Sequence, residues 1–240
     1  MSQGFSFPGL PPIRTVAAQL AVGLVLGSVV FAFGKSSFSE WIILVPGLVF
    51  TKFAFWQLLT FSFIEDNTMG VIFGALILWS IGGALENTWG RRRLWIFALG
   101  VNAAAALLTT LVALVVKPIY WHPFVGGHVM TSALWVAYGL AWGNRQTGFW
   151  GMPVTGNVLA LIGVGFVFLN GAFSSWLAII PDAFALMMAF AYVKLGFPER
   201  TFERFNSWRL RRQLARRRAH LDVVSGQKRN MPTDSDRFLH

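Results

Sequence analysis

The chain has 240 residues, of which 55% are apolar and only 12% are charged, about half the charged share of a typical soluble domain. A soluble domain of this size needs more charge to cover its surface, whereas a protein that faces lipid does not. The formal net charge of +10 is concentrated near the C-terminus, because twelve of the twenty Lys and Arg residues lie at or beyond Lys194. No folded soluble module accompanies this charge, so we expect a lipid bilayer and no nucleic acid as the partner. The chain contains no Cys, which excludes disulfide and thiolate chemistry.

Six apolar stretches are candidates to cross the ~30 Å hydrocarbon layer of a bilayer. They are 15–33, 68–86, 94–116, 127–143, 156–169 with its apolar continuation, and 181–195. We therefore predict an all-α, polytopic membrane protein built as a six-transmembrane-helix bundle. The fourth stretch is short, so we expect it to begin below one membrane surface, beside a wet cavity into which the irregular segment 117–127 dips.

The remaining segments predict a simple domain organisation. Residues 1–14 form the N-terminal segment, 15–196 the membrane domain, and 197–240 a basic tail. The apolar stretch 36–56 is broken by Pro46 and Gly47, which favours an in-plane or half-inserted loop over a seventh span. The tail is interpreted as an amphipathic helix on anionic lipid followed by a disordered end, or as ordinary positive-inside charge. Its membrane-surface candidates are Arg209, Arg211, Arg212, Arg216, Arg217 and Arg218.

The distribution of positive charge predicts the orientation. With six spans, seventeen of the twenty basic residues fall on the side that holds both termini. The positive-inside rule then places both termini in the cytoplasm. A bacterial inner membrane fits this pattern, and an organelle membrane is not excluded.

Two stretches carry a family resemblance. The segment Trp56-Gln-Leu-Leu-Thr60 precedes the second predicted helix, which ends in Gly82-Gly-Ala-Leu-Glu86-Asn-Thr-Trp-Gly90. This pattern resembles the rhomboid family, which consists of intramembrane serine proteases with a six-helix core. The resemblance covers about 15–195, with the fourth and sixth helices matched by order and spacing.

The resemblance implies that the catalytic residues are lost. In rhomboids a Ser on helix four attacks the substrate carbonyl, a His on helix six takes its proton, and helix two helps bind the oxyanion. The nucleophile position carries His128 and the base position carries Asp182 in this chain. The helix-two positions carry Glu65, Gly70 and Gly74. The resemblance therefore implies a rhomboid-like pseudoprotease, without cofactor, that binds or retains transmembrane segments of client proteins.

What the resemblance retains is scaffold, including a small-x-x-x-small seam on helix six for close packing. The retained positions are Trp56, Thr60, Gly82, Glu86, Gly90, Ala185 and Ala189.

Alternatives remain for the polar residues. His128 and Asp182 are expected to form a hydrogen-bonded pair. Because His, Asp and Glu are also competent metal ligands, a metal- or proton-binding membrane protein is a further alternative, although no metal-binding spacing is present. A rearranged protease would use Ser132, His128 and Asp182, because Ser132 lies one helical turn after His128. The plain structural interpretation is that Glu65 and Asp66 are solvated loop residues, that His128 is a satisfied cavity residue, and that Ser132 bonds back to its own helix.

Overall fold

The computed structural model describes residues 14–34, 36–149, 152–173 and 175–195. These residues belong to one compact unit, which ends at Leu195. The predicted tail helix and disordered end in 197–240, with the six arginines singled out there, lie outside the described residues.

The described elements are mostly helices, joined by short connections. In chain order they are α1 Val16–Phe33, α2 Ser36–Ile42, α3 Pro46–Thr51, α4 Gln57–Thr60, the 3-10 helix η1 Phe61–Phe63, α5 Thr68–Trp89, α6 Arg91–Val112, α7 Lys117–Tyr120, α8 Gly127–Trp142, β1 Gln146–Phe149, β2 Met152–Thr155, α9 Gly156–Phe173, the 3-10 helix η2 Trp176–Ala178, and α10 Ile179–Leu195.

The all-α, membrane-spanning prediction is confirmed, whereas the count of six spans is not. Among the described residues, five helical segments are long and apolar enough to cross a membrane: α1, α5, α6, α9, and η2 together with α10. Helix α8, at the fourth predicted position, has 16 residues. At about 1.5 Å per residue it extends only ~24 Å, less than the ~30 Å of a hydrocarbon core.

One departure from an all-helical chain is the hairpin between α8 and α9. Strands β1 and β2 pair antiparallel, with Gln146 opposite Thr155 and Thr147 opposite Val154. Three of these four residues are β-branched, a type that favours strands. The sequence pattern does not predict this hairpin, because it is short and lies between two strongly apolar helices.

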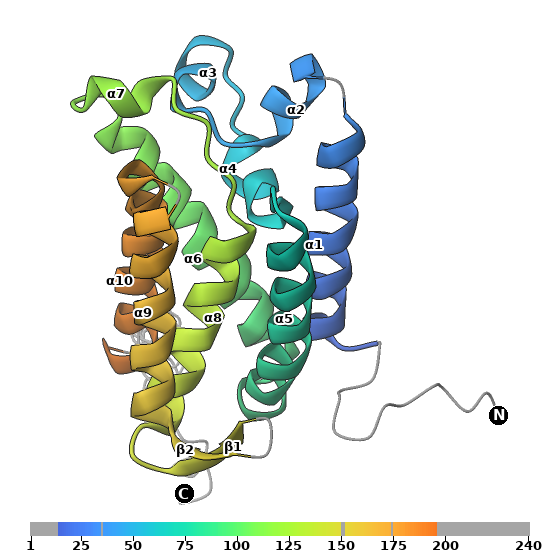
Figure 1. The fold of residues 1–240 in the computed structure, drawn as a ribbon, viewed down its shortest axis with the longest axis vertical. Helices are drawn as coiled ribbons and strands as arrows, with labels where there is room; N and C mark the ends of the chain where they lie inside the picture. The colour runs from blue at the N-terminus through green and yellow to red at the C-terminus, as the bar shows by residue number, and fades with distance from the viewer. Residues whose placement is uncertain (1–13, 35, 150–151, 174, 196–240) are drawn as a thin grey trace, which may run out of the picture. The chain divides into compact units, whose positions relative to one another are not determined.

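Helix α8 lies between α5 and α9 and packs on both, as well as on α10 (Figure 1). Helix α1 packs along α5, and α6 packs on α10. Helices α2, α3 and α7 gather at one end of the bundle, here called the loop end, and the β-hairpin lies at the opposite end (Figure 1). Most of the buried apolar side chains form one cluster, which includes Phe61, Leu78, Phe97 and Leu134.

The segment 36–56 contains only short helices, α2 and α3, in place of a span, and α3 begins at Pro46. The motif residues at 56–60 fasten this loop. The Trp56 indole N–H donates to the carbonyl of Trp41 at 2.8 Å, and the Thr60 hydroxyl donates to the carbonyl of Ile42 at 2.8 Å. Trp56 also stacks on the Trp41 ring. The loop is therefore held by side chains reaching its backbone.

The other motif residues join helices. The Glu86 carboxylate accepts the backbone N–H of Ala17 at 3.0 Å, in the first turn of α1. One turn earlier on α5, a Cβ added at Gly82 would lie 3.2 Å from the Ala17 Cβ, so the two helices pack closely here. Gly90 links α5 to α6 with φ of 84°, a conformation that favours glycine. Ala185 and Ala189 are fully buried on α10, which packs on α6 and α8.

Candidate functional site

A cavity of about 420 Å³ lies among α5, α8, α9 and α10. Most of its wall is apolar, with contributions from α5, α8 and α9. Three of its lining side chains, Met69 and Phe73 on α5 and Phe166 on α9, are also exposed on the outside of the bundle, by 65%, 49% and 55%. The cavity therefore reaches the outer surface between α5 and α9, where lipid would surround a membrane-embedded bundle.

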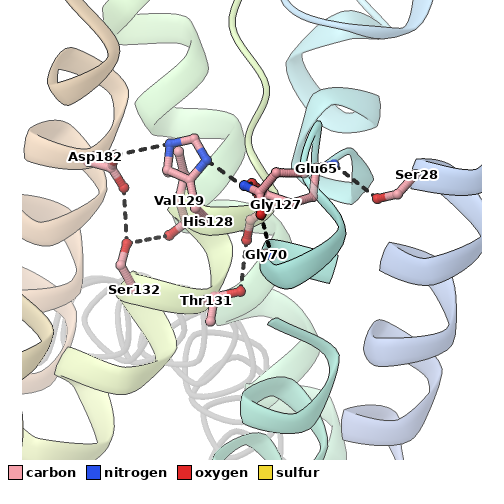
Figure 2. Close-up of polar contacts among 10 residues, drawn as sticks. Ser28, Glu65, Gly70, Gly127, His128, Val129, Thr131, Ser132 and Asp182 are labelled. Atoms are coloured by element: carbon pink, nitrogen blue, oxygen red, sulfur yellow. Dashed lines mark hydrogen bonds and ion pairs between the residues drawn. The ribbon is translucent and has the colours of Figure 1, made fainter. Parts of the chain in front are cut away.

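The polar part of the cavity is centred on His128, the second residue of α8. Its Nδ1 lies 3.5 Å from a Glu65 carboxylate oxygen, and its Nε2 lies 3.2 Å from Asp182 Oδ2 (Figure 2). The second contact has the distance of an ion pair, but neither of its atoms makes a hydrogen bond with favourable angles. His128 thus stands between two carboxylates that come from opposite sides of the cavity.

Asp182 lies in the first turn of α10, and its side chain is only 1% exposed. Its Oδ1 accepts a hydrogen bond from the Ser132 hydroxyl at 3.1 Å (Figure 2). Ser132 also lies 3.1 Å from the carbonyl of Val129 in its own helix, as the sequence predicts. Because a hydroxyl has one proton, Ser132 shares it between its own helix and Asp182.

Glu65 is placed by its backbone and by its neighbours. Its N–H donates to the Ser28 hydroxyl oxygen at 2.9 Å, and its Oε1 accepts from the Asn67 amide at 3.1 Å. A Cβ added at Gly70 would lie 2.7 Å from Oε1, and one added at Gly127 would lie 2.9 Å from Oε2. The carboxylate therefore occupies space that these two glycines leave open.

The cluster carries more acid than base. Neutral imidazole has one N–H and cannot donate to two carboxylates at once, whereas imidazolium has two. With His128 protonated and both carboxylates ionised, the three groups still sum to one negative charge. No Lys or Arg of the described chain lines the cavity.

The structure brings together the residues that the resemblance assigned to the cleft. Glu65, Gly70, Gly74, His128 and Asp182 all line this cavity, as does Ser132.

One expectation for the acidic residues needs correction. Glu65 is not a solvated loop residue, since its side chain is 5% exposed, whereas its neighbour Asp66 is exposed as expected. His122 does not line the cavity but packs edge-on against the Phe124 ring. Burial lowers the pKa of this imidazole.

The described residues hold no group of three His, Asp or Glu side chains placed to bind one metal ion. In the cluster, His128 lies between the two carboxylates, and each of its ring nitrogens faces one of them. The three side chains are therefore not arranged around one common point.

The sequence pattern did not identify some residues that form or support the cavity. Asn67 caps α5 by accepting the N–H of Gly70 at 2.6 Å and also holds Glu65. Its position directly before an apolar helical stretch is the usual signal for such a cap. Asn170 also lines the cavity. Ser28 carries no signal in the sequence, because its role depends on how α1 packs beside Glu65.

The fold and the cavity define a multi-pass α-helical membrane protein with a buried polar cluster inside its helical bundle. Residues 17–197 match the family described as "Eukaryotic integral membrane protein (DUF1751)", and the chain belongs to that family. No curated protein matches the chain. Because the family is eukaryotic, the expectation of a bacterial inner membrane is not supported.

Proposed function

We propose that this protein is a rhomboid-like pseudoprotease of six transmembrane helices, with α8 as the short fourth one, that binds transmembrane segments of client proteins without cleaving them. The observation that carries the proposal is a cavity with an apolar wall and polar floor that reaches the bundle surface between α5 and α9. A client helix entering there meets apolar side chains first and hydrogen-bonding groups deeper inside. Such groups are partners for a helix with exposed backbone or a polar side chain, which lipid cannot satisfy.

The geometry of the cluster supports binding without hydrolysis. A serine nucleophile needs a base that takes its proton, and in the usual arrangement this base is an imidazole. Ser132 instead donates to the Asp182 carboxylate, while His128 contacts the same carboxylate through its other oxygen. The helix-two position for oxyanion binding is Gly74, which has no side chain to donate.

A photo-crosslinker placed in the cavity mouth tests client binding. We suggest a photoreactive phenylalanine analogue at Phe73, on the full-length chain co-expressed with a panel of single-span reporter proteins. The matched control carries the analogue at Leu107, an exposed position on α6 outside the cavity. The proposal expects crosslinks from position 73 to intact reporters and few from position 107. Equal crosslinking from both positions would reflect random encounters in the membrane and would contradict it.

A rearranged serine protease is the second candidate, because the structure places Ser132, Asp182 and His128 in one connected chain of contacts. A fluorophosphonate probe distinguishes the two functions. The pseudoprotease leaves Ser132 unlabelled, and its reporters stay uncleaved. Labelling that disappears in Ser132→Ala, together with cleaved reporters, would establish the protease in its place.

The orientation and the tail belong to the same proposal. We infer that both termini face the cytoplasm and that the basic residues beyond Lys194 bind anionic lipid. Glycosylation acceptor sites appended to each terminus test the orientation, since only lumenal sites become modified. A vesicle flotation assay with the peptide 197–240 tests lipid binding. We expect the peptide to float with anionic vesicles and not with neutral ones.

A further inference from the structure

With His128 protonated and both carboxylates ionised, the cavity has one negative charge that no described lining side chain balances. Glu65 and Asp182 are 5% and 1% exposed, and His128 is the only basic side chain among the described residues that line the cavity. A buried carboxylate stays ionised only when other groups pair with it or donate hydrogen bonds to it. One further positive charge would complete this site.

An acceptor atom is also left open. Asp182 Oδ2 is buried and accepts no hydrogen bond from the described residues, although it faces His128 Nε2. An ionised carboxylate oxygen can accept two hydrogen bonds. By contrast, Oδ1 of the same side chain is occupied by Ser132. The open acceptor therefore lies on Asp182, a residue that lines the cavity. It is a second observation, separate from the unbalanced charge.

The wall of the cavity that leads to the acidic cluster is apolar. A ligand that enters between α5 and α9 passes Met69, Phe73 and Phe166 before it reaches the acidic cluster. A hydrated free cation is poorly suited to such a route. A cationic side chain with a long apolar stem is well suited, because the stem covers apolar surface while the charged end reaches the polar group.

We propose that the cavity selects transmembrane segments that carry a Lys or Arg side chain, with Glu65 and Asp182 as the anionic partners of the basic group. This inference rests on the proposed function and names the class of client. A basic residue within a membrane span is costly in lipid and gains charge-assisted hydrogen bonds in the cavity. Charge complementarity thus explains both the acidic excess and its position at the end of an apolar passage.

The test uses purified full-length protein in lipid nanodiscs, with the photoreactive analogue at Phe73. The ligands are synthetic Leu/Ala-rich helices of about 20 residues that differ at one position, which carries Lys, Arg, Gln, Leu or Glu. That position is moved along the peptide so that the side chain samples several depths. At the best depth we expect Lys and Arg peptides to crosslink on the order of tenfold more than the Leu peptide, and the Glu peptide least.

Two variants assign the preference to the cluster. Asp182→Asn and Glu65→Gln remove one negative charge each with little change in shape, and each should reduce the Lys-to-Leu ratio several-fold. Asp66→Asn is the matched control, because this exposed carboxylate is adjacent to Glu65 but does not line the cavity. The peptide series on the chain with the analogue at Phe73 and an intact cluster remains decisive even when a cluster variant fails to fold.

Each outcome has a distinct meaning. A Lys preference that falls in both cluster variants and persists in Asp66→Asn supports the inference. Equal crosslinking by Lys and Leu peptides overturns the inference but leaves client binding intact. A Lys preference that is unchanged in both cluster variants also overturns it, because another group would then bind the cation. The absence of crosslinks to every peptide refutes both the inference and the proposed function.

Discussion

The Glu86 carboxylate near the end of α5 accepts the backbone N–H of Ala17 near the start of α1, at 3.0 Å and across 69 residues of sequence. The first N–H groups of a helix have no partner within that helix. Thr15 satisfies another of them, since its hydroxyl accepts the N–H of Ala18. Glu86 is 7% exposed, so bulk water does not reach this contact to accept the Ala17 N–H in its place. Glu86, a motif residue of α5, thus provides a hydrogen-bond acceptor for the N-terminus of α1.

We expect Glu86→Ala to lower the free energy of unfolding by about 1–3 kcal/mol, because it leaves a buried N–H without an acceptor. Glu86→Gln keeps an acceptor oxygen and should lose less. Arg91 also contacts Glu86, at 3.6 Å, but its side chain is 66% exposed, so Arg91→Gln should have little effect. Thermal unfolding in detergent ranks the three variants. If Arg91→Gln were as damaging as Glu86→Ala, the ion pair would be the stabilising contact.

Close backbone approach between α8 and α9 makes a second prediction. A Cβ added at Gly139 would lie 2.5 Å from the backbone N of Ala160 and 2.5 Å from the backbone O of Gly156. Backbone atoms cannot rotate away, so Gly139→Ala must push the helices apart, and we expect a loss of about 1–3 kcal/mol. Gly165 on α9 has no atom within 4 Å of an added Cβ. Gly165→Ala should therefore be neutral or stabilising by up to about 1 kcal/mol. Similar losses in both variants would contradict the packing described for α8 and α9.

The sequence predicted much of this fold because lipid imposes simple requirements on a chain. Long apolar stretches must be helical to satisfy their backbone groups. Pro46 and Gly47 interrupt the stretch 36–56, which contains short helices in place of a span. The β-hairpin at 146–155 was missed, because four-residue strands produce no recognisable pattern beside such helices. The shortness of α8 was predicted from the length of the apolar stretch 127–143.

The site was predictable only in part. Motif order placed His128 and Asp182 on the correct helices, and the structure brings them to 3.2 Å. The burial of Glu65 was not predictable, because it depends on Ser28 of α1 and on the space beside Gly70 and Gly127. A Glu-Asp-Asn sequence before a helix is ordinarily a solvated loop. Only tertiary contacts distinguish the buried Glu65 from the exposed Asp66.

Gln57 makes a third prediction, for the loop end of the bundle. It is fully buried; its Oε1 accepts the N–H of Val45 at 3.1 Å, and its amide donates to the carbonyl of Glu40 at 2.9 Å. Gln57→Leu keeps the volume but leaves two backbone groups unpaired, and we expect a loss of about 2–6 kcal/mol, from 1–3 for each group. Gln57→Glu keeps one acceptor and should lose the contact to Glu40.

Hydrogen exchange provides a local measurement of the same variant. In Gln57→Leu we expect faster exchange at Val45 and in residues 40–45, while α9 remains protected. Gln57 follows Trp56 in the motif but differs from it in burial, as Trp56 is 47% exposed. Trp56→Phe should therefore affect exchange less. Uniformly faster exchange across the bundle would instead indicate global destabilisation.

The contact between His128 and Asp182 makes a fourth prediction, which a double-mutant cycle measures. His128→Ala leaves two buried carboxylates facing a cavity without a cation, and we expect a loss of about 3 kcal/mol, typical of a broken buried pair. Asp182→Ala leaves His128 with Glu65 as its remaining partner. The double variant should lose less than the sum of the single losses, with a coupling energy of about 1–3 kcal/mol. Thr88, which is exposed near the other end of α5, provides the control, because His128→Ala combined with Thr88→Ala should be additive. Additive losses for His128 and Asp182 would mean that their proximity has no energetic effect, and the acidic cluster would then lack the interaction on which its role in the cavity depends.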